Sequence, residues 1–482
     1  MTQARRHARN ALALLLSGIA SKLLFLVASL IIVKKVSVGV NGDYRLALLT
    51  FGQVFAVLTE FGLRGYMVRQ FARIRDNYAS AQALFAETVY LRLLLFAVFF
   101  PIFQILMHAL GYSSEFLSVA GWFLVYAFLD AASMGFKATL RAYERMEFDA
   151  WFSILGRGLI AAGVYLLYKN GALTLQNIAL VHLSAAAVET TGLTFTVRFV
   201  TRLSPFRLPQ WSAMKRVFLE SLPFAVLVVV GMLYLRTGSL VLSWLRSSDD
   251  VSYLYTAAMI PEAGNFIPIA VVNALLPFLA RNHGNTPLVQ AYFSALMRYL
   301  GLIAAAIAVY FFWETRWIIL LFSKPEYLVA ETTFRWMGAW LILTFLQYAM
   351  ANMLICLNQE KLVLRRYLLM LPLNIILNVV FVPKWGAAGA AAALTLSEVF
   401  CILFDVVMLH NCGIVVHIRI VLQVLGLIAL GGATLYCAEP LPQWPRVLMA
   451  GALMTAFIVG TALYHDRRLI SAVFARKTHD EA

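Results

Sequence analysis

The chain has 482 residues, of which 62% are hydrophobic and 13% are charged, and its formal net charge is +15. A soluble globular protein carries about 25% charged residues, so this composition excludes a soluble fold of this length. The mean hydropathy of +0.79 agrees. A spanning helix uses about 20 apolar residues, which leaves room for about 14 spans and for no large catalytic module outside the bilayer. The sequence therefore predicts an all-α integral membrane protein.

Continuous apolar runs bounded by charged residues, Gly, Pro or Asn mark the expected spans. The runs are unbroken rather than alternating, which excludes the strands of an outer-membrane barrel. In chain order the predicted spans are 11–33, 46–67, 83–107, 116–137, 152–168, 177–200, 217–244, 251–279, 290–313, 328–356, 364–383, 387–409, 418–438 and 444–464.

Basic residues are concentrated at alternate ends of these spans, for example at Arg69, Arg141, Lys361 and Arg419. Cytoplasmic loops carry an excess of Lys and Arg, so this pattern places both termini in the cytoplasm. The net charge is thereby explained by orientation, and we expect no nucleic-acid partner.

An internal repeat organises the chain. Tyr44 opens the second span and Tyr253 the eighth, 209 residues later, while Arg73 and Arg281 close the same spans with an offset of 208. Repeats in the same orientation predict two parallel-related six-helix bundles about an axis along the membrane normal, with the substrate path between them. A C-terminal helical hairpin is appended. The predicted domains are an N-terminal bundle at 1–205, a C-terminal bundle at 206–412, and two additional helices with a cytoplasmic tail at 413–482.

Two cations lie inside spans, where a charge costs roughly 2.5–3.5 kcal/mol on insertion scales. Lys22 is at the centre of the first span and Arg236 is inside the seventh, so each sits on the first helix of its predicted bundle. Cations facing a shared lumen would attract an anionic group such as phosphate. The alternative is that each forms a structural ion pair, for example with Glu60 or Glu262.

Three carboxylates inside spans, Glu60, Asp130 and Glu262, are candidates for coupling to a proton or sodium ion. A carboxylate held at low dielectric can load and release a proton as a site alternates. Arg64 lies one turn from Glu60 and favours its charged form, which weakens this interpretation for Glu60. Arg64 itself is either a substrate contact or an anchor at the inner face.

The eighth span contains Pro261 and Pro268 on either side of Gly264-Asn265. Proline inside a helix removes a backbone hydrogen bond, so this span is predicted to be kinked or broken. Transporters often build sites from a carboxylate beside such a break, here Glu262. The alternative is a static kink with Glu262 reaching toward the interface.

Motifs for chemistry are absent from the sequence. It contains no phosphate-binding loop, metalloprotease helix or nucleophile elbow, and its outward loops are short. Its cysteines show no C-x-x-C spacing, which argues against a disulfide framework or metal site. We therefore expect no catalytic residues, no metal, no cofactor and no enzyme activity.

Four short motifs point to a family: Ser17-Gly18-Ile19-Ala20-Ser21-Lys22, the turn Val38 to Tyr44, Glu60-Phe61-Gly62-Leu63-Arg64, and Trp385-Gly386-Ala387-Ala388-Gly389. Together they resemble Wzx-type polysaccharide and O-antigen flippases of the multidrug/oligosaccharidyl-lipid/polysaccharide (MOP) exporter superfamily. The chain departs from that pattern at Asn41-Gly42-Asp43, where a Gly-Pro type turn is usual.

The resemblance implies a flippase of the cell inner membrane that moves an undecaprenyl-diphosphate-linked oligosaccharide to the periplasmic leaflet by alternating access, during surface polysaccharide biosynthesis. Lys22 and Arg236 would hold the diphosphate, with Arg64 as a further substrate contact. The implied partners are the lipid-linked oligosaccharide, membrane lipids, and the polysaccharide polymerase and chain-length machinery. A cation-coupled multidrug or metabolite antiporter of the same superfamily remains the alternative, since it would use carboxylates such as Asp130 and Glu262. A membrane enzyme of glycan assembly is disfavoured by the short outward loops.

Overall fold

The computed structural model describes residues 3–74, 77–282 and 284–465, and every regular element in these residues is a helix. The all-α prediction is therefore confirmed. The predicted cytoplasmic tail, residues 466–482, lies outside the described residues.

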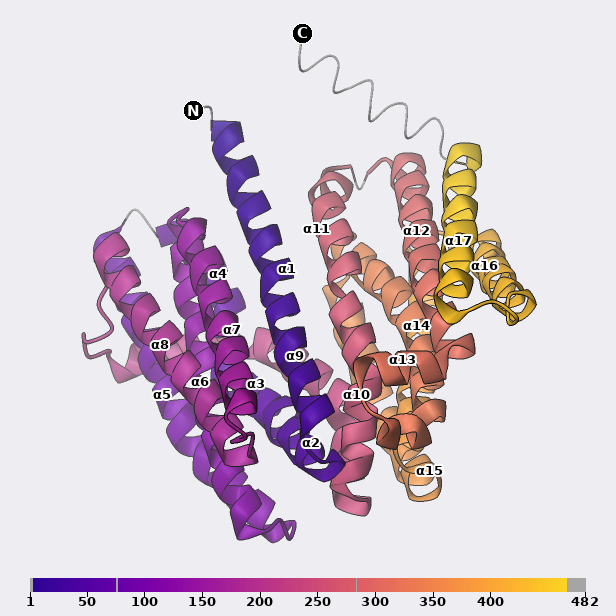
Figure 1. Cartoon of the computed structure of the whole chain (residues 1–482). Coiled ribbons are helices and arrows are strands. Elements are labelled where there is room, and N and C mark those ends of the chain that lie inside the picture. Colours follow the sequence, from indigo (N-terminus) through magenta and orange to yellow (C-terminus); the bar gives the residue numbers. More distant parts are fainter. Residues whose placement is uncertain (1–2, 75–76, 283, 466–482) are drawn as a thin grey trace. The chain divides into compact units, whose positions relative to one another are not determined.

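The first part of the chain forms long helices with short connections (Figure 1). Several begin at a side chain that accepts a backbone N–H of the first turn, as Asn77, Ser113 and Thr174 do. The elements are α1 (Gln3–Lys35), α2 (Val38–Arg45), the π-helical turn η1 (Leu46–Phe51), α3 (Gly52–Glu60), α4 (Leu63–Ile74), α5 (Tyr78–Ala109), α6 (Ser114–Ala142), α7 (Met146–Lys169), α8 (Leu175–Thr201) and α9 (Trp211–Leu245).

The second part continues in the same manner and ends in the predicted hairpin. Its elements are α10 (Ser248–Gly264), α11 (Phe266–Arg281), α12 (Thr286–Trp313), α13 (Thr315–Phe322), the 3-10 turn η2 (Pro325–Ala330), α14 (Glu331–Cys356), α15 (Glu360–Asn411), α16 (Ile418–Cys437) and α17 (Gln443–His465).

Thirteen helical segments in the described residues are long and apolar enough to cross a membrane. One of them, α15, has 52 residues. A straight helix of this many residues would be about 78 Å long at 1.5 Å per residue, more than twice the apolar thickness of a bilayer. Helix α15 is interrupted at Gly386, whose φ of 53° and ψ of −131° are not helical, so α15 holds two spans. The total agrees with the fourteen predicted.

Asp250 stabilises the interruption at Gly386. Its Oδ1 accepts the backbone N–H of Ala387 at 2.9 Å, as a helix N-cap does. A Cβ at position 386 would lie 2.4 Å from Oδ1 of Asp250, and any residue with a side chain would have to adopt the positive φ seen at this position. Glycine is therefore required at this turn by both backbone conformation and space.

The chain divides into two compact units by its contacts. One comprises Met1–Met259, Phe322–Glu326 and Tyr367–Ala393, and the other comprises Ile260–Leu321, Tyr327–Arg366 and Leu394–Ala482. In the first unit α1 packs along α7, and α6 packs against α8. In the second unit α12 packs against α14 and α16. The domain boundaries drawn from the sequence repeat remain a prediction.

Two spans are broken, and only the break in the eighth was predicted from the sequence. In the second span α3 ends at Phe61, which has a φ of 48°, and Gly62 follows with a φ of 69°. A side chain at position 62 would lie 2.6 Å from the backbone nitrogen of Ala225, so only glycine fits there. The eighth span is divided at Asn265 into α10 and α11, which confirms the break predicted from its prolines.

Candidate functional site

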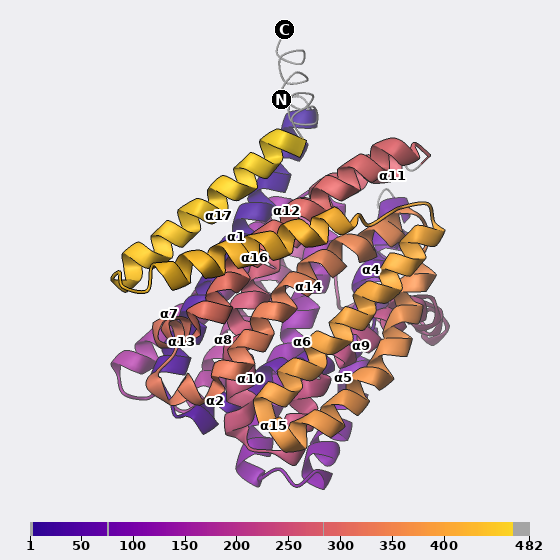
Figure 2. The same cartoon turned by 90° about the vertical axis from the view of Figure 1, so that its right-hand side faces the viewer.

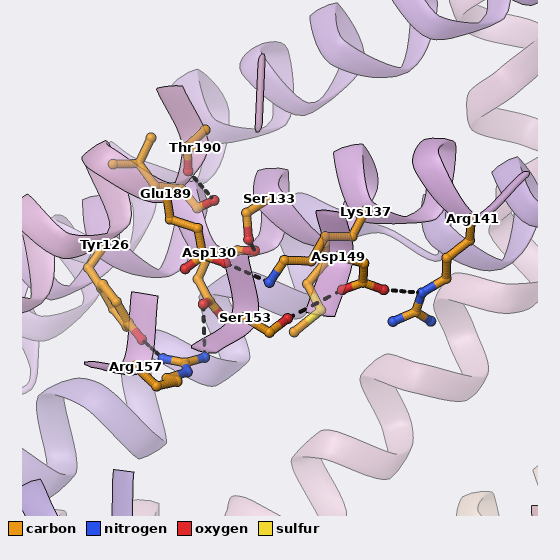
Figure 3. Close-up of polar contacts among 12 residues, drawn as sticks. Tyr126, Asp130, Ser133, Lys137, Arg141, Asp149, Ser153, Arg157, Glu189 and Thr190 are labelled. Atoms are coloured by element: carbon orange, nitrogen blue, oxygen red, sulfur yellow. Dashed lines mark hydrogen bonds and ion pairs between the residues drawn. The ribbon is translucent and has the colours of Figure 1, made fainter. Parts of the chain in front are cut away.

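The first unit contains a row of charged and polar side chains inside its helices (Figure 3). The row follows one face of α6, because its members recur three or four residues apart. They are Tyr126, Asp130, Ser133, Lys137 and Arg141. The partners come from α7 and α8, so three helices contribute to one polar strip.

Asp130 is paired with Arg157 at the middle of α7. An Arg157 Nη lies 3.0 Å from an Asp130 Oδ, and both side chains are 24% exposed. The other Nη of Arg157 donates to the hydroxyl of Tyr126, and the guanidinium lies 5.9 Å from the ring centroid of Phe25 on α1. Arg157 is about 17 Å from either end of α7. It is therefore a mid-membrane cation tied to α6 and in contact with α1.

Lys137 and Glu189 form a second pair, which is more deeply buried. Their charged atoms are 2.5 Å apart, and the side chains are 8% and 7% exposed. Gly156 of α7 gives the carboxylate its space, because a Cβ at this position would lie 2.0 Å from the Glu189 oxygen. The neighbouring Thr190 donates to the carbonyl of Leu129 at 3.0 Å, which fixes α8 against α6.

The row ends at Arg141 and Asp149, near the turn between α6 and α7. The Asp149 carboxylate is 2% exposed and accepts from the half-exposed Arg141 and, at 3.3 Å, from Ser153. The three pairs together contain three cations and three anions. Their opposite charges compensate one another, as burial at low dielectric requires.

A buried histidine lies beside the Arg157 end of the row. His182 of α8 has no solvent exposure, and its Nε2 is 3.2 Å from the hydroxyl of Tyr44. Its ring also meets the ring of Tyr126 edge to face, with centroids 5.1 Å apart. Tyr126 thus links Arg157 of α7 to His182 of α8, and His182 in turn contacts Tyr44 of α2.

Arg236 occupies a second polar cluster of the same unit. Its side chain is 8% exposed, and its Nε and Nη2 donate to Oε1 of Gln53 at 3.1 and 2.7 Å. The guanidinium also lies 5.4 Å from the ring centroid of Tyr255. The Tyr255 hydroxyl is 2.7 Å from Thr50, which in turn donates to Ser239 at 2.9 Å.

The local backbone explains how this cluster is built. Thr50 belongs to the π-helical turn η1, and Gln53 follows directly in α3. A π-turn changes the direction in which successive side chains point, and such turns are frequent at functional sites. Arg236 is about 14 Å from the Leu245 end of α9, well inside the apolar thickness.

The other predicted site residues have different environments. Lys22 of α1 is exposed and lies three residues before Phe25. Glu60 accepts the backbone N–H of Gly62 at 3.1 Å and that of Arg64, so it caps the start of α4. The exposed Arg64 reaches the sulfur of Met134 at 3.7 Å.

Glu262 belongs to the second unit, one residue after Pro261 and two before the end of α10. Lys22, Arg64, Arg236, Glu60 and Asp130 all belong to the first. The structure thus brings Asp130 into the charged row and Arg236 into its own cluster. The ion-coupling and substrate roles of all six residues remain predictions.

Sequence reasoning missed Arg157, Lys137 and His182 as parts of a site. The signal was present for Arg157, which interrupts the apolar run 152–168 in the same way that Lys22 interrupts the first. For Lys137 the signal was its spacing of seven residues from Asp130, which places both side chains on one helix face. His182 carried no distinguishing pattern.

The chain is similar to known proteins both in sequence and in fold. The family described as "Polysaccharide biosynthesis protein" matches residues 7–283. No curated protein matches the sequence. Among solved structures, lipid II flippase MurJ in an inward closed conformation is similar with a TM-score of 0.75 and 14% identity, covering 94% of this chain and 99% of that chain.

Two further solved structures share the fold. An inward-facing multidrug resistance MATE family transporter of the MOP superfamily has a TM-score of 0.66 and 15% identity, over 80% of this chain and 92% of that one. A MOP superfamily transporter from Pyrococcus furiosus has a TM-score of 0.58 and 14% identity, over 82% and 93%. These structures are of transporters and a flippase, not of enzymes. The family match covers more than half of the chain, and the chain therefore belongs to the polysaccharide biosynthesis protein family and has the fold of MOP superfamily transporters.

Proposed function

We propose that this multi-pass membrane protein translocates a lipid-linked oligosaccharide, attached through undecaprenyl diphosphate, from the cytoplasmic to the periplasmic leaflet of the inner membrane. Both termini lie in the cytoplasm in this proposal, and the product supplies surface polysaccharide biosynthesis. Support comes from the family match and from the similarity to a lipid II flippase over nearly the whole chain. The family match does not favour the cation-coupled antiporter.

The observation that carries the proposal is the buried guanidinium of Arg236. Gln53 and Tyr255 hold it in place, and neither of these two side chains carries a charge. A guanidinium presents paired N–H donors that suit phosphate oxygens, so Arg236 is assigned to the diphosphate. Lys22 and Arg64 are assigned as further substrate contacts.

Translocation solves a solvation problem. A glycan cannot cross hydrocarbon, because each hydroxyl would lose its hydrogen bonds to water at a cost of several kcal/mol. A polar path shelters the glycan while the lipid tail stays in the bilayer. An inside-negative potential favours export of the anionic headgroup by about 2.3 kcal/mol per charge per 100 mV.

Ion coupling is assigned to Asp130, Glu60 and Glu262, with Asp130 the best supported. Its pairing with Arg157 is part-exposed and lies at mid-membrane depth, where a carboxylate can exchange its partner for a cation. The polymerase and the chain-length machinery are proposed partners that receive the exported oligosaccharide.

The test is charge reversal in the native host, with surface polysaccharide measured against the amount of membrane-inserted protein. Arg236→Glu and Lys22→Glu are expected to abolish export of the glycan. Lys215→Glu is the matched control, since Lys215 is an exposed cation on the same helix as Arg236. Normal export with both Arg236→Glu and Lys22→Glu would refute the assignment, and loss of cationic-drug efflux instead would support the antiporter.

A further inference from the structure

A basic cavity lies in the second unit, and none of its lining residues belongs to the charged row on α6 or to the Arg236 cluster. Its volume is about 430 Å³, and it is lined by side chains of α12, α16 and α17. The polar lining consists of Arg298, His417, Arg419, Gln423 and His465. No carboxylate is among the lining residues of the described chain, so the cavity has a positive potential suited to an anion.

The cavity walls are held by specific contacts. Gln290 of α12 donates from Nε2 to the carbonyl of Val415 at 2.7 Å and accepts the N–H of Val415 at 2.8 Å. This reciprocal pair fixes the segment that leads into His417 and α16. Arg298 lies two helical turns beyond Gln290 on the same face of α12. The arginine therefore faces a wall whose position is set by hydrogen bonds between the Gln290 side chain and the backbone of Val415.

Two of the helices that line the cavity, α12 and α16, pack tightly next to it. A Cβ at Gly301 would lie 2.8 Å from the Val424 side chain, so α12 and α16 are in close contact there. Arg298 and Gln423 lie next to this contact, on its cytoplasmic side in the proposed orientation. Figure 2 shows α16 and α17 diverging from the connection between them, and the cavity lies toward the open end, near His417 and His465.

The chemistry of the lining matches a phosphate group. Guanidinium groups bind phosphate through paired N–H donors, and the amino end of the 20-residue helix α16 adds a positive partial charge. Basic pockets between membrane helices on the cytoplasmic side are suited to lipid headgroups.

The surface beside the cavity distinguishes a lipid from a soluble anion. Ile418, Leu422 and Leu425 of α16 are 68%, 60% and 55% exposed, and their spacing puts them on one face of the helix. This apolar strip begins at the cavity and runs into the span. A headgroup in the cavity would leave its acyl chains along these side chains.

From these observations we infer that the cavity between α12, α16 and α17 binds the phosphodiester headgroup of an anionic phospholipid from the cytoplasmic leaflet. Arg298 and Arg419 contact the phosphate oxygens, and the exposed face of α16 contacts the acyl chains. The lipid then acts as a third element that holds the appended hairpin against α12. The inference does not require the proposed transport function, because it concerns binding alone.

The test is native mass spectrometry of the full-length protein in detergent with phosphatidylglycerol or phosphatidylcholine added at equal mole fraction. Phosphatidylglycerol should be retained in preference to phosphatidylcholine. Arg298→Gln and Arg419→Gln should each lower its retention about fivefold. Arg281→Gln is the matched control, because it removes an exposed cation from the end of α11 without touching the cavity, and it should retain the lipid as the wild type does.

A second measurement uses the unmodified protein, so it does not depend on whether a variant folds. A photoactivatable phosphatidylglycerol should label peptides of α12 and α16 near positions 298 and 418–425. Equal retention of both lipids, or labelling confined to other helices, would overturn the inference. Displacement of the lipid by inorganic phosphate would assign the cavity to a soluble anion. Displacement by undecaprenyl phosphate at equal mole fraction would assign the cavity to the carrier lipid. Either result would also overturn the inference.

Discussion

The Lys137–Glu189 pair gives the sharpest quantitative prediction. At 2.5 Å and an effective dielectric of about 20, the attraction between the two charges is about 7 kcal/mol. Most of that is offset by the desolvation of two side chains that are more than nine-tenths buried. Removing one partner leaves the other charge uncompensated, which costs about 3–5 kcal/mol, whereas replacing both by apolar groups is often neutral or stabilising.

We therefore expect Lys137→Met and Glu189→Leu each to lower the free energy of unfolding by about 3–5 kcal/mol. The double variant should recover most of this loss, because neither buried charge remains. The measurement is a double-mutant cycle of unfolding in mixed detergent micelles, with thermal midpoints as a second readout.

The chain offers an internal control for this cycle. Arg145 and Glu147 form an ion pair at 2.6 Å, close to the length of the buried pair, but their side chains are 42% and 52% exposed. The same cycle at this pair should give a coupling of under about 1 kcal/mol. If the losses at Lys137 and Glu189 simply add in the double variant, or if the exposed pair couples as strongly, the buried-pair reasoning fails.

Three further predictions concern packing, capping and a second buried pair. Gly156→Ala places a methyl group 2.0 Å from the Glu189 carboxylate. It should lower the free energy of unfolding by about 1–3 kcal/mol in the same micelle titration. An unchanged free energy would show that Glu189 can move at no cost. Glu60→Ala removes the acceptor for two backbone N–H groups. The start of α4 should therefore lose about 0.5–2 kcal/mol of protection in amide hydrogen exchange. Full protection would contradict the capping role. Asp405→Asn leaves the fully buried Arg366 guanidinium without its ion-pair partner and should cost about 3–5 kcal/mol in thermal or denaturant unfolding, whereas a wild-type midpoint would exclude a charged pair there.

Sequence alone predicted the spans well, because each needs a long apolar run regardless of its neighbours. The run 364–383 and the run 387–409 were separated correctly at Lys384-Trp385-Gly386, where the non-helical backbone of Gly386 interrupts α15. The prolines of the eighth span also indicated the break near Asn265. These features are local, so they can be deduced from the chain order of the residues.

Partners across helices could not be predicted in the same way. Arg366 lies five residues after Lys361, among the basic residues that the positive-inside pattern assigns to the cytoplasmic end of a span, yet it has no solvent exposure and is paired with Asp405, 39 residues away. Arg45 lies directly before the predicted span 46–67, at the position of a loop cation, and is also buried, donating to Asn41 within α2. Positive-inside counting reads residue type and position along the chain. It contains no information about which helix packs against a given side chain.

The candidate site shows the same division. The spacing of Asp130 and Lys137 on α6 is visible in sequence, but their separate partners, Arg157 on α7 and Glu189 on α8, depend on how the helices pack. Glu60 was considered as a partner for a buried cation. It instead bonds to backbone N–H groups of the turn that follows it, because the left-handed residues 61 and 62 bring those groups within reach.

The arrangement of the charged row has a consequence for how the first unit moves. Three ion pairs join α6 to α7 and α8 at three depths, and each would expose or separate buried charges if one helix slid past another. Alternating access in transporters of this kind relies on largely rigid-body motion of one bundle against another. We therefore expect α6, α7 and α8 to move together. The Lys137→Met/Glu189→Leu variant removes the ion pair that joins α6 to α8, so it should keep most of its stability but lose coordination between these two helices. Cysteine pairs placed across α6 and α8 and across α6 and α7 would measure this with spin-label distance distributions. In the double variant the distribution across α6 and α8 should broaden, whereas the distribution across α6 and α7, whose two ion pairs are intact, should stay as narrow as in the wild type. Equally narrow distributions across α6 and α8 in both proteins would refute the argument.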